Sequence, residues 1–228
     1  MEWRGRRGSN NIEDRRSVVG GGMRVGGIGV VLVVIVGALL GIDPSTLLGN
    51  LEPQQTTGTG EITEADKAAG EFVSVVLADT EEIWANVFKA QLNRTYKPAT
   101  LVLYKGVTAS PCGDASGATG PFYCPVDKKV YLDTDFFTTM SRELGAGGDF
   151  AMAYVVAHEI GHHVQDELGI LSKANQMRSQ VSEAESNAIS VMIELQADCF
   201  SGIWAREVHE QFGAIQKGDF EEAVNAAK

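Results

Sequence analysis

The chain has 228 residues, 44% of them hydrophobic, which fits one globular domain with an additional segment. Its 19 basic and 30 acidic residues give a formal net charge of −11 at pH 7. This acidic balance, without a basic stripe or a stacking-aromatic motif, argues against a nucleic-acid-binding function.

Residues 1–24 are rich in arginine and glycine and show no apolar periodicity, a composition that predicts a disordered tail. They contain six arginines against three acidic residues, whereas the remainder of the chain is acidic. Positive charge before a membrane span marks its cytoplasmic side. We therefore expect a basic cytoplasmic tail, with the rest of the chain after the span outside the cytoplasm.

Residues 25–42 contain no charged side chain and would form a helix of ~27 Å, close to the ~30 Å hydrocarbon thickness of a bilayer. They predict one transmembrane helix. A cleaved signal peptide is the alternative, with a shorter apolar core and a small-x-small cleavage site. The sequence from Asp43 to Leu48 shows no such site, which favours an uncleaved anchor. Residues 43–62 have the composition of a flexible linker.

Residues 63–228 are expected to form the folded domain. Thr63 and Asp66 have the spacing of a capping box at a helix start. Apolar residues then recur at helical spacing to about Leu92. The aromatic residues in this stretch are interpreted as core residues.

Two short strands are predicted at residues 100–104 and 129–133. The second is expected to be the edge strand with which an extended peptide pairs. Between the strands, Cys112 and Cys124 bracket a loop rich in glycine and serine, where a disulfide would add ~3 kcal/mol in the chain-entropy model. Such a bond persists outside the cytoplasm, and two free thiols are the alternative.

A helix is predicted from about residue 150 to residue 168, and it carries His158, Glu159 and His162. Residues i and i+4 lie ~40° apart around a helix, so both imidazoles project from one face and can bind one metal ion. Glu159 lies beside the first ligand, where it can take a proton from metal-bound water. The pattern predicts a zinc site, and an amphipathic helix with surface histidines is the alternative.

A second long helix is predicted from about residue 183 to residue 212, after a polar connection or broken helix at 170–182. Glu194 and Asp198 lie four residues apart on it and therefore share a face. One carboxylate can bind the metal while the other orients a ligating histidine. A solvated acidic face is the alternative, disfavoured by the apolar neighbours Leu195, Cys199, Phe200, Ile203 and Trp204.

The other histidines and the third cysteine are not expected to bind the metal. His163 lies ~140° from His158 around the helix and is interpreted as a supporting partner or a surface residue. His209 lies ~22 Å along the helix from Glu194 and is interpreted as a surface residue. Cys199 has apolar neighbours and is expected to be a buried free thiol.

The chain resembles the neutral zinc metallopeptidase family of bacterial membrane-anchored proteins. The resemblance implies that His158, His162 and Glu194 bind Zn²⁺, that Glu159 is the general base and that Asp198 supports a ligand. It rests on the segments Trp3–Arg7, Asn11–Arg16, Asp43–Gly49, Ala118–Pro125, His158–Gln165 and Glu194–Cys199 together with the apolar run.

The chain departs from the family pattern in two places. Val191-Met192-Ile193 stands where family members usually carry an arginine, and members continue beyond Lys228 through a further helical stretch. No residue is a clear donor for a transition-state oxyanion, and Tyr131 and Tyr154 are the nearest candidates.

The sequence thus predicts an α+β, mostly helical zincin-like domain with a small β-sheet or hairpin, preceded by one transmembrane helix. We expect a zinc peptidase of the bacterial cell membrane that acts outside the cytoplasm on peptides or proteins, with Glu159 as base. The alternative is a non-catalytic, zinc-stabilised domain that binds peptides or envelope partners.

Overall fold

A 29-residue helix, α3 (Glu64–Leu92), forms one side of the hydrophobic core. The predicted capping box begins it: the Thr63 hydroxyl accepts from the Asp66 amide, and the Asp66 carboxylate accepts from the Thr63 amide. Asn93, in a left-handed conformation, ends it. The buried face of α3 includes Phe72 and Trp84, as the helical spacing of the apolar residues predicts.

The computed structural model describes residues 1–16, 62–116, 120–137 and 148–226. Within these ranges, none of the helices is both long enough and apolar enough to cross a membrane. The predicted transmembrane helix at 25–42 lies outside the described residues, as does the predicted linker at 43–62 apart from Ile62.

A four-stranded sheet has the order β1-β2-β6-β5. Its central strands, β2 (Thr100–Tyr104) and β6 (Lys129–Asp133), are parallel and coincide with the two predicted strands. β1 (Ile12–Asp14) is parallel to β2, and β5 (Phe122–Cys124) is antiparallel to β6. The prediction that β6 is an edge strand is therefore wrong, because β5 covers it.

The two faces of the sheet have different neighbours. Leu101, Leu103, Val130 and Leu132 point to the main core, which includes residues of α3 and of helix α5 (Asp149–Glu167). The alternate residues form a separate small cluster, consisting of Val102, Tyr104, Cys124 and Tyr131 with Phe122 packed against it. This period-two alternation places Tyr123, between Phe122 and Cys124, on the face that looks toward α5.

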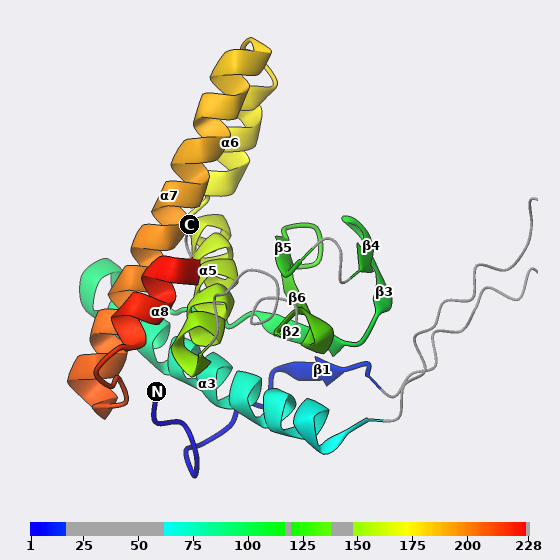
Figure 1. Ribbon diagram of the computed structural model, residues 1–228. Coiled ribbons are helices and arrows are strands. Elements are labelled where there is room, and N and C mark those ends of the chain that lie inside the picture. Colours follow the sequence, from blue (N-terminus) through cyan, green and yellow to red (C-terminus); the bar gives the residue numbers. More distant parts are fainter. Residues whose placement is uncertain (17–61, 117–119, 138–147, 227–228) are drawn as a thin grey trace, which may run out of the picture. The chain divides into compact units, whose positions relative to one another are not determined.

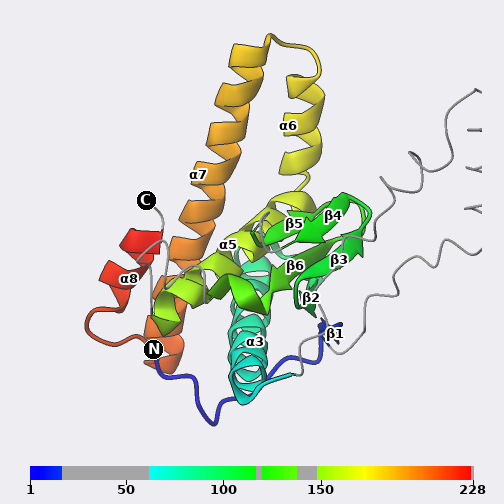
Figure 2. The ribbon, with the colours of Figure 1, turned by 45° about the vertical axis from the view of Figure 1, so that its right-hand side comes forward.

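Three further helices follow α5. α6 (Ile170–Arg178) and α7 (Glu183–Glu207) form a hairpin. α7 continues into a π-helical turn, η1 (Val208–Phe212), whose end at Phe212 agrees with the predicted end of the helix at about residue 212. α8 (Asp219–Ala226) then packs against α5 (Figures 1 and 2). Residues 170–178, predicted as a polar connection or broken helix, are thus a helix of their own.

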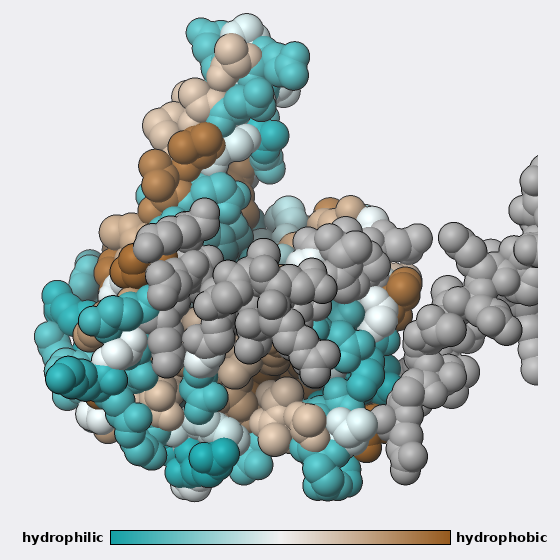
Figure 3. Space-filling view, viewed as in Figure 1, coloured by the Kyte–Doolittle hydropathy of each residue, from teal (hydrophilic) through white to brown (hydrophobic). Residues whose placement is uncertain are grey.

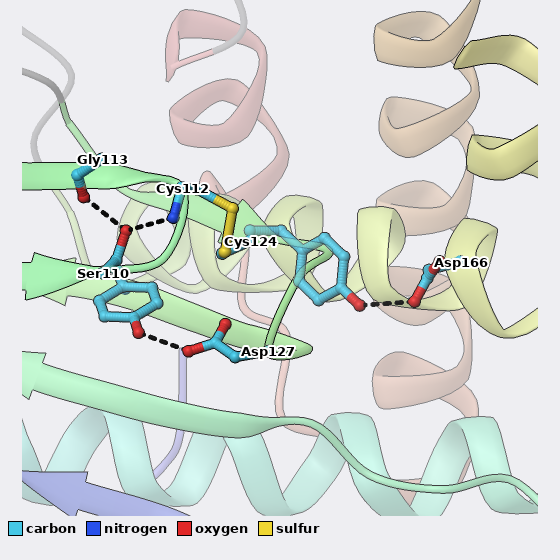
Figure 4. Close-up of a disulfide and its surroundings, with 8 residues drawn as sticks. Ser110, Cys112, Gly113, Cys124, Asp127 and Asp166 are labelled. Carbon is cyan, nitrogen blue, oxygen red and sulfur yellow. Dashed lines mark hydrogen bonds between the residues drawn. A yellow bond between two sulfur atoms is a disulfide. The ribbon is translucent and has the colours of Figure 1, made fainter. Parts of the chain in front are cut away.

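The predicted disulfide between Cys112 and Cys124 is present. Cys112 lies in the turn between β3 (Val107–Ser110) and β4 (Gly113–Ser116), which pair as a separate hairpin. Cys124 ends β5 and is fully buried. The bond therefore ties the tip of the hairpin to the edge of the main sheet (Figure 4).

The prediction of a disordered tail is wrong for the described residues Met1–Arg16. They belong to the same unit as the domain from Ile62 onward, and they add β1 to its sheet. Trp3 is 6% exposed and contacts Phe72 edge-on, with ring centroids 5.5 Å apart. Polar composition concealed this segment from sequence analysis, because its order comes from partners far along the chain.

Candidate metal centre

Helix α5 presents a column of three side chains on one face. Tyr154, His158 and His162 follow one another at intervals of four residues, one helical turn apart. The rings of His158 and His162 are nearly perpendicular, with centroids 4.8 Å apart. Their side chains are 19% and 14% exposed, so the centre lies at the protein surface and solvent can reach it.

Helix α7 brings an acidic column to face these histidines. The Glu194 Oε2 atom lies 3.2 Å from His158 Nε2 and 3.3 Å from His162 Nε2. The structure thus brings together His158, His162 and Glu194, the three residues assigned as ligands from the sequence, with ligand atoms within 4.8 Å of one another.

The Nδ1 atom of each imidazole, on the side of the ring away from Glu194, contacts a side-chain oxygen. His158 Nδ1 lies 2.9 Å from Asp198 Oδ1, which also accepts a hydrogen bond from the Tyr154 hydroxyl. His162 Nδ1 lies 2.9 Å from Gln165 Oε1. A carboxylate oxygen and an amide oxygen only accept hydrogen bonds, so each Nδ1 carries a hydrogen, and in the neutral ring each Nε2 then presents a lone pair.

With both imidazoles neutral, the form that binds a metal ion, three acceptors meet: two imidazole nitrogens and one carboxylate oxygen. Such a group is repulsive by itself, and a cation stabilises it. Ligands of a tetrahedral zinc ion with bonds of ~2.0–2.1 Å are ~3.3 Å apart, in agreement with the two nitrogen–oxygen distances. The donor set fits Zn²⁺ and leaves one of its four positions for water or substrate.

Glu159, the predicted base, is only 8% exposed although it lies next to a surface site. Burial raises the pKa of its carboxyl to about 7, and the negative charge of Glu194 adds to this increase. His162 and a hydrogen bond from the Tyr123 backbone amide act in the opposite direction. A carboxyl with a pKa near neutrality can both accept and return a proton.

The Tyr123 amide that binds Glu159 comes from the edge strand β5, and a polar network behind α5 holds that strand. The Tyr123 hydroxyl lies 3.0 Å from Asp166 Oδ2 and 3.2 Å from His163 Nδ1. His163 Nε2 lies 2.7 Å from the Lys97 carbonyl oxygen. His163 is therefore buried at 2% exposure rather than on the surface, and it binds no metal ligand directly.

At Gly161, between the two histidines, α5 lies close against the backbone of α7. A Cβ atom there would lie 3.0 Å from the Ala197 carbonyl oxygen and 3.2 Å from Ala197 Cα. Ala197 itself is fully buried. The missing side chain thus lets the histidine column and the acidic column meet.

Two of the residues in the network could have been identified in the sequence by spacing. Gln165 lies three residues after His162, on the same side of the helix, and its Nε2 donates to the Ile193 carbonyl oxygen on α7. Tyr154 lies four residues before His158, and the sequence indicates it only as a candidate oxyanion donor. Its hydroxyl instead donates to Asp198.

Of three other expectations, those for Tyr131 and Cys199 differ from the structure and the one for His209 agrees with it. Tyr131 belongs to the small cluster on the far face of the sheet, where its hydroxyl donates to Asp127, so it is not at this centre. Cys199 is exposed rather than buried. His209 is exposed, as expected.

The apolar neighbours of Glu194 on α7 do not all enter the core. Trp204 is buried, but Val191, Met192 and Leu195 are 57%, 59% and 61% exposed. Figure 3 shows hydrophobic side chains on the surface of the α6–α7 hairpin. The acidic column therefore stands beside an exposed apolar stripe, not inside an apolar environment.

Comparison with known proteins identifies a family and several relatives that resemble this chain. The family described as "Putative neutral zinc metallopeptidase" matches residues 1–228. The uncharacterized protein YpfJ of Escherichia coli strain K12 is 43% identical over 238 residues, covering 100% of this chain and 82% of YpfJ. The uncharacterized protein Rv2575 of Mycobacterium tuberculosis strain H37Rv is 40% identical over 173 residues, covering 73% of this chain and 57% of Rv2575. No solved structure gives a significant match.

Proposed function

Since the chain belongs to the neutral zinc metallopeptidase family, we propose that it is a zinc-dependent peptidase in which His158, His162 and Glu194 hold the metal. The observation that carries the proposal is the convergence of three acceptor atoms, with both histidine Nδ1 atoms already occupied by oxygen partners. When bound, zinc polarises a carbonyl group and lowers the pKa of a coordinated water molecule.

Glu159 is the general base of the proposed reaction. Its carboxylate accepts the proton of the attacking water and passes it to the amine that leaves when the peptide bond breaks. Its buried position and a pKa of about 7 suit both halves of this transfer. Asp198 and Gln165 keep the imidazoles in the tautomer that metal binding requires.

The edge strand β5 supports a peptide as substrate. Its Tyr123 amide points to Glu159, so the edge of β5 that is not paired with β6 looks toward the metal centre. An extended peptide can pair with such an edge through its backbone. In this proposal β5, rather than β6, aligns the substrate beside Glu159.

The exchange Glu159→Gln tests the reaction directly. We expect the variant to keep one zinc ion per chain but to cleave a peptide library at least ~10²-fold more slowly, since general-base catalysis contributes about that much or more. Metal analysis and mass spectrometry of the products provide the two measurements. Cleavage at the parent rate would show that Glu159 is not the base.

Two histidine variants supply a matched comparison for the metal. His158→Ala should lose zinc and activity together, whereas His209→Ala, at an exposed position away from the centre, should keep both. A parent protein that binds zinc but cleaves nothing, with or without chelator, would instead support a non-catalytic zinc-stabilised domain.

The location of the protein also belongs to this proposal. The Cys112–Cys124 disulfide favours an oxidising compartment outside the cytoplasm for the metal centre. The uncharged run at 25–42 favours attachment to a membrane.

A further inference from the structure

The segment Met1–Arg16 is bound to the metal domain along its whole length. At its start, the Met1 ammonium group lies 3.3 Å from Asp219 at the beginning of α8. The Trp3 indole N–H donates to Asp149 at the first turn of α5, at 2.9 Å. These contacts connect the segment to the helix that carries His158 and His162 and to the helix packed against it.

The middle of the segment contacts α3. The Arg6 guanidinium donates to the Asp79 carboxylate at 2.7 Å and stacks on the Phe212 ring, 4.5 Å from its centroid. The Ser9 amide donates to the Ser74 carbonyl oxygen at 2.9 Å. Contacts that combine backbone hydrogen bonds, an ion pair and ring packing define one position for the segment.

The end of the segment is a strand in the sheet of the domain. β1 pairs with β2 in the register Ile12 to Leu101 through Asp14 to Leu103. The Arg16 guanidinium then donates to the Asp66 carbonyl oxygen and lies so close to Gly70 that a Cβ there would be 2.7 Å from it. The chain therefore leaves the domain after Arg16 beside the place where it returns at Ile62 (Figure 1).

We propose that Met1–Arg16 and the metal centre lie on the same side of the membrane. A single crossing by residues 25–42 would place ~30 Å of hydrocarbon between them and would break every contact described above. The chain must then emerge, at Ile62, on the side from which it departed after Arg16. The Cys112–Cys124 disulfide assigns the oxidising side to both parts.

The arginines that indicated a cytoplasmic tail have another role in this arrangement. Arg6 pairs with Asp79, Arg15 with Glu13 at 2.7 Å, and Arg16 with Asp14 at 2.6 Å. Arginines that pair with carboxylates of their own domain have partners inside the fold, so their number no longer reports orientation across a membrane. This inference does not depend on the proposed peptidase activity.

A cysteine pair tests the shared location. A Cβ atom on Gly8 would lie 3.4 Å from Ser74 Cβ, about 0.1 Å below the ~3.5–4.5 Å range of Cβ separations in disulfides. In the full chain with Gly8→Cys and Ser74→Cys, mild oxidation of isolated membranes with copper phenanthroline should join most chains internally. The matched pair Gly8→Cys and Ser179→Cys, with its second position exposed at the end of α6, should remain unjoined.

Absence of the internal bond, with both thiols still reactive, would overturn the proposal. A disulfide between two chains would still place the segment and the metal centre on the same side of the membrane. It would overturn the docking of the segment onto its own chain.

A second measurement avoids any change inside the contact. Asn10 is exposed, and Cys199 is a natural exposed thiol near the metal centre. In the variant Asn10→Cys, a membrane-impermeant maleimide should label both thiols in right-side-out vesicles and neither in inside-out vesicles. Labelling of the two thiols from opposite sides would overturn the proposal. Labelling of both thiols only in inside-out vesicles would support a shared side but overturn its assignment as the oxidising side.

Discussion

The two imidazoles of the metal centre are supported by partners of different charge. Asp198 is a carboxylate shared with Tyr154, so His158 faces a negative group whose second contact is a phenol. Gln165 is a neutral amide, fully buried, that connects His162 to the backbone of α7 at Ile193. The neutral partner therefore also links α5 to α7.

Exchange of Gln165 for methionine removes both amide functions while keeping a similar side-chain volume. We expect zinc to bind ~10–100-fold more weakly, because His162 loses the acceptor that holds its Nδ1 hydrogen. Competition with a chromogenic chelator measures this change. Gln176→Met, at an exposed position on α6, is the control and should leave the affinity unchanged. An unchanged affinity in Gln165→Met would show that Gln165 does not orient the ligand.

At the scale of elements, the centre depends on how two helices cross. His158 and His162 come from α5, and Glu194 comes from α7, so no single element can assemble the ligand set. Gly161 and Ala197 form a close contact between the helices. Their small size determines how far the acidic column stands from the histidines.

Exchange of Gly161 for alanine should push the helices apart, because the new Cβ atom would meet backbone atoms of Ala197 at 3.0 and 3.2 Å. We expect a loss of ~1–3 kcal/mol in the free energy of unfolding, together with weaker zinc binding. Urea denaturation and chelator competition measure the two effects. Gly202→Ala on α7, with nothing within 4 Å, should instead be neutral or stabilising by up to ~1 kcal/mol. Equal behaviour of the two variants would contradict the close-contact argument.

The start of α3 gives the fold a dependence on acid pH. Burial alone would raise the pKa of Asp66, but Lys105 and the Thr63 hydroxyl and amide lower it from 3.8 to about 2. A lowered pKa in the folded state stabilises the fold above pH ~4, and this contribution disappears as the pH falls toward 2.

Exchange of Asp66 for asparagine should therefore destabilise the protein by about 2 kcal/mol at pH 7 and by much less near pH 2. Urea denaturation at several pH values, with chelator present so that zinc release does not contribute, measures the difference. Glu64→Gln, whose side chain is 88% exposed, should change stability little at any of these pH values. A constant difference between pH 7 and pH 2 would rule out the electrostatic origin.

At the scale of the whole molecule, the N-terminal segment closes the domain rather than preceding it. Trp3 fills a space between α3 and the start of α5, and β1 covers the edge of β2. An uncovered β2 would present unpaired backbone groups to other chains.

Exchange of Trp3 for alanine should lower the free energy of unfolding by ~3–5 kcal/mol, the usual cost of emptying a buried tryptophan site. The neighbouring Arg7→Ala, with a side chain that is 60% exposed, should change it by less than ~0.5 kcal/mol. Urea denaturation of the purified full chain compares them. A small effect of Trp3→Ala would mean that docking of the segment contributes little to stability.

The sequence predicts correctly those features whose geometry follows from local spacing. The intervals of four residues identified the faces of α5 and α7, and the capping box located the start of α3. The sequence does not predict features that depend on residues far away along the chain, such as the formation and order of strands. β1 has three residues and forms only because β2 offers an edge, and β6 is central only because β5 returns beside it. The apolar residues around Cys199 could not show which side of α7 faces α5.

The adjacency of Arg16 and Asp66 makes Ser17–Glu61 an insertion between two parts of one folding unit. A water-soluble form for crystallisation would therefore be obtained by excising the insertion and joining residue 16 to residue 62 through a short glycine linker. Starting the chain at residue 62 would instead discard a strand and a buried indole, and the shortened product should precipitate or misfold.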